Sequence, residues 1–411
     1  MRTRLTLIFL ITVNGALFAQ KDRLDYYLAF AKTSSPILFD LRNQVASSMY
    51  DSLLIRATYK PQVSGSSTNT FSPIIGGWGY DAVLTNKVNF NTLVGVNKQL
   101  MNTKVVNAQF QTIALQNRSL DNTARITEQD ITRAVTAQYI MAYGDQLQLK
   151  FIQEIKSLLN GEEVILKELT RKNVYKQVDY LAFLVTLQQQ DLLLKQQDIQ
   201  FMYDYAGLAY LCGIEDTTRT ELKSPDLSTL PIPDLYHSVF FKQFELDSLK
   251  LRNNRTLVDM SYKPRINLYA NAGYMSSFIM DPYKNFGTSF GISALIPIYD
   301  GKQKNMQYSK IAVAERTRQN NRAFFSNQYN QQLNQLRQQL GATEALIENI
   351  RGQLKYTQSL IEVNGKLLEV GEARITDYIL ALNNYIQVKN LVTQNMITRL
   401  QIINQINYWN R

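Results

Sequence analysis

The sequence predicts a mostly α-helical protein in which a pair of β-strands and a hairpin of two long helices occur twice. Three observations support this fold class. An internal repeat has an offset of nearly 200 residues, two long regions contain no proline, and one of these regions has the apolar spacing of a coiled coil. Together these features account for most of the 411 residues.

The internal repeat organises the chain. Three pairs of segments match: 59–63 with 262–266, 98–104 with 296–302, and 178–181 with 376–379. Asn102 and Asp179 lie 77 positions apart, and Asp300 and Asp377 are separated by the same number. Chance similarity between short motifs would not keep this length constant. The match therefore indicates a true duplication.

Each repeat is predicted to contain a short helix, two strands and a long helical hairpin. The predicted boundaries are a signal peptide at 1–19, a first repeat at 20–211 with strands in 61–98 and a hairpin at 103–211, a connector at 212–235, and a second repeat at 236–411 with strands in 264–298 and a hairpin at 302–411. The short helices, at 37–58 and 239–260, are expected to cover the part of each outgoing helix that the shorter returning helix leaves exposed.

The helical hairpins are predicted from proline, from apolar spacing and from turn residues. Residues 74–224 and 298–411 contain no proline, as long helices require. In the second region, positions spaced alternately by four and three form a coiled-coil seam: Tyr329, Leu333, Leu336, Leu340, Thr343, Ile347, Ile350, Leu354, Thr357, Ile361, Asn364 and Leu368. Asn173 and Gly371 readily take a left-handed conformation, so each is predicted to end an outgoing helix.

Strands are predicted between the Tyr-Lys-Pro motifs and the long helices. On one predicted strand a single face carries Phe286, Thr288, Phe290, Ile292, Ala294 and Ile296. Alternation with a polar opposite face suits either a half-exposed soluble sheet or a barrel with a wet lumen. Because the smallest membrane barrels need eight strands and one chain offers four, a barrel would require several chains.

Residues 1–19 have the features of a secretory signal peptide. Arg2 and Arg4 precede an apolar run from Leu5 to Val13, and small residues follow from Ala16 to Ala19. The apolar run is too short to cross a membrane as a helix. A mature chain that enters a membrane would then do so as a closed β-barrel, and the leader favours the barrel interpretation of the strands.

The composition excludes several classes of function. The chain has one His, His237, and one Cys, Cys212, so it cannot supply the three or four His and Cys ligands of a typical zinc or iron site. No nucleophile–base pair or phosphate-binding loop is found. The net charge of +10 comes from basic residues scattered along the sequence, which argues against a nucleic-acid surface. We therefore predict no enzyme, no catalytic residue, no cofactor or metal, and no nucleic-acid partner.

The order of these features resembles the TolC family of outer-membrane efflux proteins. The strand exit Leu295–Gly301 is similar to that of the family, and Val370–Ile379 is similar to its glycine-containing turn with an Asp six residues on. The resemblance implies a homotrimer in the outer membrane of a Gram-negative-type cell, with 12 strands forming a β-barrel in contact with lipid. It also implies a periplasmic α-barrel that holds most of the mass and serves an inner-membrane transporter through a periplasmic adaptor.

The resemblance implies roles for five residues at the hairpin tips. Asp377, Asp179 and Arg374 would form the periplasmic gate, and the turns at Asn173 and Gly371 would dock the adaptor. A simpler interpretation of the aspartates is that they are helix N-terminal acids, favoured by the helix dipole.

The tips depart from the family pattern at three positions. Asn173 stands in place of the glycine in the first tip. Leu380 stands where well-known members have a second acidic residue, and Ala373 stands where they have an Arg, with Arg374 next to it. The family's gating details are therefore not carried over whole.

The predicted function is the exit duct of a tripartite efflux or type I secretion system. The substrate class stays open among drugs, metal ions and proteins. The alternative is a secreted or periplasmic coiled-coil scaffold or adaptor without a pore, which would share the leader and the heptads. A scaffold would not need alternating strands at matched positions in both repeats.

Overall fold

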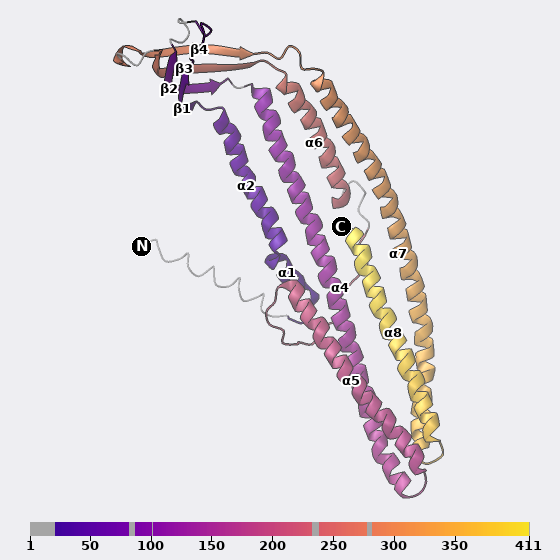
Figure 1. The fold of residues 1–411 in the computed structure, drawn as a ribbon. Helices are drawn as coiled ribbons and strands as arrows, with labels where there is room; N and C mark the ends of the chain where they lie inside the picture. The colour runs from indigo at the N-terminus through magenta and orange to yellow at the C-terminus, as the bar shows by residue number, and fades with distance from the viewer. Residues whose placement is uncertain (1–20, 82–86, 101, 232–237, 278–281, 411) are drawn as a thin grey trace, which may run out of the picture. The chain divides into compact units, whose positions relative to one another are not determined.

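The computed structural model describes residues 21–81, 87–100, 102–231, 238–277 and 282–410. The predicted signal peptide and His237 lie outside these residues. The elements, shown in Figure 1, are α1 (Leu24–Ser34), α2 (Pro36–Thr58), β1 (Gln62–Phe71), β2 (Val88–Gln99), α4 (Thr103–Arg171), α5 (Gln177–Cys212), α6 (Val239–Ser261), β3 (Arg265–Ser276), η1 (Pro282–Lys284), β4 (Phe286–Leu295), α7 (Gln303–Glu369) and α8 (Ile375–Trp409).

Two compact units make up the chain, and each contains parts of both repeats. Unit 1 comprises Met1–Phe39, Ala124–Val239 and Phe324–Arg411. Unit 2 comprises Asp40–Thr123 and Phe240–Ala323. The long helices α4 and α7 contribute to both units. None of the helices in the described ranges contains a stretch long and apolar enough to cross a membrane.

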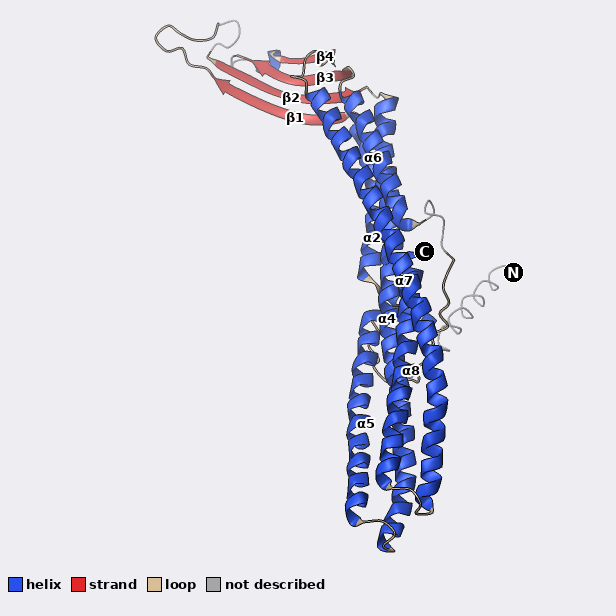
Figure 2. Ribbon diagram, turned by 90° about the vertical axis from the view of Figure 1, so that its right-hand side faces the viewer, coloured by secondary structure: helices blue, strands red, loops and turns tan. Residues whose placement is uncertain are grey.

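Unit 2 contains a four-stranded antiparallel sheet in the order β1-β2-β3-β4, drawn in red in Figure 2. In the register, Val94 lies opposite both Gly65 and Ala272, and Ala270 lies opposite Phe290. Directly opposed residues share a face of a sheet. The register therefore aligns the predicted apolar positions of β4 on one face with alternate residues of β1, β2 and β3.

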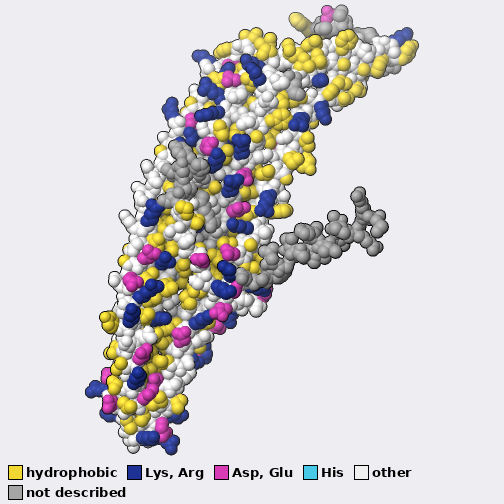
Figure 3. Space-filling model, turned by 180° about the vertical axis from the view of Figure 1, so that it is seen from behind, with side chains coloured by type: hydrophobic (Ala, Val, Ile, Leu, Met, Phe, Trp, Pro, Cys, Tyr) yellow, Lys and Arg dark blue, Asp and Glu magenta, His cyan; other side chains and the backbone are white. Residues whose placement is uncertain are grey.

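The two faces of the sheet differ in polarity. One face carries Val63, Phe71, Val88, Phe90, Val94, Val96, Ile266, Leu268, Tyr274, Phe286, Phe290 and Ile292. The other carries mostly Asn, Gln, Ser, Thr and Gly. Phe290 is 89% exposed and Ile292 is 71% exposed, and apolar side chains are visible over the strands in Figure 3. The apolar face is thus uncovered in the single chain.

Short helices cover the first parts of α4 and α7 within unit 2, as predicted. From α2, Arg56 stacks on Phe110 of α4 at 5.5 Å. From α6, the Asn253 side-chain amide donates to the backbone oxygen of Ala108 (3.0 Å) and to the Thr112 hydroxyl (2.8 Å). The Arg318 guanidinium of α7 donates to a backbone oxygen of α6.

Unit 1 contains the hairpins α4–α5 and α7–α8, and the predicted seam of α7 is confirmed. All twelve seam positions are buried or partly buried, and nearly all residues between them are exposed. Leu336 packs against Ile402 and Ile406 of α8. Ile350 packs against Val388 and Val392. The coiled-coil spacing therefore marks the face that the returning helix covers.

Helix α1 was not predicted from the sequence. It contributes Tyr27 and Ala31 to a core with Tyr139 of α4 and Leu208 of α5. Cys212 also lies in this core, fully buried at the last residue of α5, and burial raises the pKa of its thiol to about 12. The Cys212 thiol is therefore a packing group.

Candidate functional site at the hairpin tips

Both outgoing helices end in the same way. Asn173 and Gly371 have φ angles of 62° and 80°, so the predicted left-handed turns are confirmed. In the first tip, the Val174 N–H donates to the Leu169 oxygen at 2.9 Å, and in the second the Glu372 N–H donates to the Leu367 oxygen at 2.9 Å. This bonding pattern is the Schellman motif, which satisfies helix carbonyls that would otherwise lack partners.

The candidate gate residues lie at the starts of the returning helices. Asp179 and Asp377 are in the first turns of α5 and α8, where the helix dipole favours a negative charge. Arg374 is the N-cap residue of α8 and is exposed. Among the described residues, Arg374 forms no ion pair with either aspartate, so one chain does not bring the predicted gate pair together.

The two tips contact each other through Tyr175, a residue that sequence reasoning missed. Its hydroxyl donates to the backbone oxygens of Leu368 and Ala373, both at 2.9 Å. A Cβ added at Gly371 would lie 2.8 Å from Val174 Cγ1 of the first tip. The turns of the two hairpins therefore lie side by side within the chain.

A hydrophobic core lies behind the tips and joins all four long helices. It contains Phe151, Ile155, Leu159 and Leu166 of α4, Phe183 of α5, Ile361 and Leu368 of α7, and Ile375, Tyr378 and Leu382 of α8. Glu162 Oε2 and the Tyr378 hydroxyl are buried without hydrogen-bond partners among the described residues. Burial, with a smaller effect of the Glu369 charge, raises the pKa of Glu162 to about 6.

An acidic pair, Asp145 of α4 and Asp204 of α5, lies between these two helices. Asp204 is 4% exposed, and its carboxylate accepts bonds from the Gln138 and Gln200 side-chain amides at 3.0 and 2.6 Å. The Gln197 amide donates to Asp145 Oδ1 at 3.0 Å. Burial first, and then the hydrogen bond and charge of Asp204, raise the pKa of Asp145 to about 7. A protonated Asp145 relieves the repulsion between its carboxyl group and that of Asp204.

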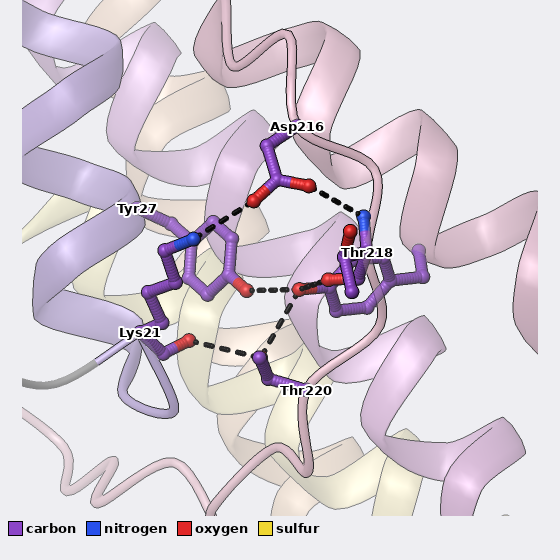
Figure 4. A network of polar contacts seen from close by, with 6 residues as sticks. Lys21, Tyr27, Asp216, Thr218 and Thr220 are labelled. Atoms are coloured by element: carbon purple, nitrogen blue, oxygen red, sulfur yellow. Dashed lines mark hydrogen bonds and ion pairs between the residues drawn. The ribbon is translucent and has the colours of Figure 1, made fainter.

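The start of the described chain is fastened to the connector, as Figure 4 shows. Lys21 Nζ forms an ion pair with Asp216 at 2.9 Å, and the hydroxyls of Tyr27 and Tyr205 share a hydrogen bond of 3.1 Å. The Thr220 hydroxyl lies 3.1 Å from the Tyr205 hydroxyl. Hydrogen bonds from Thr218 and from Lys21 lower the pKa of Asp216. We call this network, together with the Lys223–Asp22 ion pair at 2.6 Å, the clasp.

Nothing in this geometry resembles a catalytic arrangement. In the described part of the chain, no group of three or more His, Cys, Asp or Glu residues is placed to hold a metal ion. The tips instead present turns, exposed charges and a shared apolar core.

Comparison with known proteins agrees with this architecture. No family model and no curated relative matches the sequence. The solved structures that match nearly the whole chain include the following three. The chain is similar to CusC, whose crystal structures concern folding and transmembrane channel formation. The identity is 12% and the TM-score is 0.77, over 94% of this chain and 92% of CusC.

The other two structures are an outer-membrane protein and an outer-membrane channel. VceC of Vibrio cholerae matches at 10% identity and a TM-score of 0.75, over 94% of this chain and 96% of that one. The open MtrE channel of Neisseria gonorrhoeae matches at 11% identity and a TM-score of 0.72, over 94% of this chain and 88% of that one. The chain has the fold of the outer-membrane channels of the TolC family.

Proposed function

We propose that the chain is the outer-membrane exit duct of a tripartite efflux or type I secretion system. Its strands would form the membrane part, and its long helical hairpins would lie in the periplasm. It would act as a channel and would catalyse no reaction. The substrate class is one of drugs, metal ions or proteins.

One observation carries this proposal: the register aligns an exposed apolar face across all four strands of the sheet. In water, exposure of Phe286, Phe290 and Ile292 on one face of β4 would promote aggregation. In a membrane the same face is covered by lipid, while the polar face lines a lumen. The fold shared with outer-membrane channels supports the membrane interpretation.

Closure of the barrel requires more than one chain. The edge strands β1 and β4 each pair on one side only in the single chain. Unpaired backbone groups are very unfavourable in lipid, so the edges must pair with those of neighbouring chains. We propose a homotrimer with 12 strands, as the resemblance implies.

The tips would serve as the gate and as the docking surface. Asp377 and Asp179 would form an acidic constriction, with Arg374 of one hairpin close to Asp179 of the adjacent hairpin in the closed trimer. The turns at Asn173 and Gly371 would contact a periplasmic adaptor, and the adaptor would recruit an inner-membrane transporter.

The alternative, a coiled-coil scaffold or adaptor without a pore, makes a different prediction for the extracted protein. We expect the outer-membrane fraction to yield a trimer that dissociates only on heating and that forms ion-conducting channels in planar bilayers. A monodisperse monomer with its full β-sheet signal would contradict the proposal. Chemical crosslinking in cells, followed by purification, should recover the inner-membrane transporter with the trimer.

A further inference from the structure

The positive charge of the chain is concentrated in one unit. Unit 2 contains 20 of the 44 Lys and Arg residues and only 10 of the 34 Asp and Glu residues. Unit 1 contains 24 of each. The whole net charge of +10 therefore lies in the unit that carries the sheet. Because unit 2 consists of two segments far apart in sequence, this concentration is not visible along the chain.

Part of this charge lies at one end of the sheet. The start of β1, the end of β2, the start of β3 and the end of β4 lie at the same end, because the four strands are antiparallel in chain order. Seven basic residues fall at or near these strand ends: Lys60, Lys98, Lys104, Lys263, Arg265, Lys302 and Lys304. The connections at the opposite end, 72–87 and 277–285, contain two Lys and two Asp.

Four of these lysines repeat by the internal duplication. Lys60 matches Lys263, and Lys104 matches Lys302. The backbone contacts of the first pair also match: the Lys60 N–H donates to the Ala57 oxygen at 3.0 Å, and the Lys263 N–H donates to the Met260 oxygen at 3.1 Å.

The second pair, Lys104 and Lys302, follows two residues that accept hydrogen bonds at the helix starts, Asn102 and Asp300. The Lys104 N–H donates to Asn102 Oδ1 at 3.0 Å, and the Lys304 N–H donates to Asp300 Oδ2 at 2.8 Å. Lys302 itself lies in the turn before α7, with a φ of 66°, whereas Lys104 is already in the first turn of α4.

The four lysines are available to a ligand. All four are exposed, and in the described ranges none of them forms an ion pair. The acidic residues nearest in sequence are already engaged. Asp259 pairs with Lys304 at 3.3 Å and bonds to the Tyr308 hydroxyl, and Asp300 caps the start of α7.

From this placement we infer that Lys60, Lys104, Lys263 and Lys302 form a belt that binds the phosphate groups of anionic phospholipids. The inference rests on the proposed function, because the apolar face of the sheet places the hydrocarbon region next to the belt. Lysine ammonium groups at this level meet lipid headgroups on the periplasmic side of the outer membrane. Basic residues close to a membrane surface attract anionic lipid. In a trimer the duplicated pairs would repeat six times around the barrel.

The test uses the full-length oligomer and two defined lipids, phosphatidylglycerol and phosphatidylcholine. Native mass spectrometry would count the lipids retained after insertion into mixed vesicles. We expect phosphatidylglycerol to be enriched over its share in the vesicle, and the enrichment to fall at high salt because salt screens exposed charges. Replacing all four lysines by Gln should abolish the enrichment, with about a five-fold loss for each lysine that contacts a given lipid.

A matched control removes the same charge elsewhere in unit 2. Arg118, Lys310, Arg316 and Arg322 are exposed and lie on the helices away from the strand ends. Their combined replacement by Gln should leave the enrichment unchanged. Equal losses in the two variants would show a bulk charge effect and would overturn the belt.

The remaining outcomes separate the belt from the proposed function. A wild-type oligomer that inserts but retains both lipids in vesicle proportions overturns the belt and leaves the channel proposal intact. Displacement of phosphatidylglycerol by inorganic phosphate at equal concentration would indicate a free-anion site and would also overturn it. Failure to form an inserted oligomer at all overturns both proposals.

Discussion

Unit 1 and unit 2 share the long helices α4 and α7 but differ in how far their apolar surface is covered and in their net charge. In unit 1 the α7 seam is covered by α8, both tips are joined by Tyr175, and the charges balance. In unit 2 the sheet leaves an apolar face open, and the unit carries the whole net charge of the chain. Unit 1 buries the α7 seam within one chain, whereas unit 2 presents an apolar sheet face that other molecules must cover.

This difference predicts that the two units fail in different ways. Substitutions in unit 1 should alter the stability of the folded chain, because their contacts are intramolecular. Substitutions on the apolar face of unit 2 should alter insertion and assembly, because the described residues leave much of that face exposed. Each measurement below separates these two kinds of failure.

The largest effect is expected on the apolar face of the sheet. Phe290→Lys should reduce the heat-modifiable trimer in the outer membrane to a trace, because a lysine near the middle of a barrel's lipid face costs about 2–4 kcal/mol for each chain. Gel electrophoresis of membrane fractions with and without heating measures this loss. Ser289→Lys is the matched control, since Ser289 lies on the polar face of the same strand. Equal losses in the two variants would contradict the assignment of the faces.

A smaller effect is expected at the second tip in unit 1. Gly371→Ala should destabilise the helical hairpins by about 1–3 kcal/mol, because the new methyl group meets Val174 and the left-handed backbone disfavours a side chain. Thermal unfolding followed by the helical circular dichroism signal measures the change.

The first tip provides the comparison for this variant. Asn173→Gly should be neutral or stabilising by up to about 1 kcal/mol, because glycine takes the left-handed conformation without strain. Insertion into the outer membrane should be unchanged in both variants. Loss of insertion in Gly371→Ala without a change in stability would contradict the division of roles between the units.

The acidic pair in unit 1 predicts a pH dependence. The folded-state pKa of Asp145 is about 7, above its ordinary value near 4, so the folded chain binds more protons between these pH values. This contribution therefore destabilises the fold as pH rises from about 4 to about 7. Asp145→Asn should remove this slope and stabilise the protein at pH 8 by about 1–2 kcal/mol, a value reduced from the full shift because Asp145 is partly exposed.

Chemical unfolding at pH 5 and pH 8 checks this expectation. Asp198→Asn serves as the control, because Asp198 is an exposed acid on α5 that pairs with Arg219 at 2.6 Å. Its loss should cost less than about 1 kcal/mol and leave the slope of the wild type. An unchanged slope in Asp145→Asn would show that the pH dependence of stability comes from another group.

The smallest effect is expected for the exposed charges of the tips. Asp377→Asn should reduce the cation preference of single channels and their block by divalent ions, because like charges that converge in a narrow mouth attract counter-ions. Arg374→Ala should raise the open probability. Unaltered selectivity in Asp377→Asn would identify Asp377 as a helix-end acid only, and unaltered gating in Arg374→Ala would assign closure to packing of the tips.

The periodic parts of the fold were predictable from the sequence. The α7 seam was identified residue by residue, because a repeated spacing of apolar side chains directly reflects which face is buried. The turns at Asn173 and Gly371 were found because few residue types take a left-handed conformation. The strand positions followed from alternation, and the register then showed that the faces align.

The contacts that lack periodicity could not be predicted. Tyr175 reaches the second tip, 193 positions away at Leu368, and no local pattern marks that pairing. Asp145 and Asp204 lie on different helices, so only the fold brings their carboxyl groups together. Helix α1 carries no motif of the repeat. The positive charge of unit 2 is not visible as a cluster in the sequence, because two distant segments form that unit.

The clasp has a consequence for the order of folding. It joins Lys21 to Asp216, 195 positions apart, and at the other chain end the Asn407 side chain donates to the Ser228 oxygen, 179 positions away. Contacts over such separations require closure of very long loops and form slowly compared with helical hairpins. We therefore expect the connector to become ordered only after the residues at both ends of the chain have packed against it. Pulsed hydrogen exchange during refolding should find its amides protected last, after those of both hairpins.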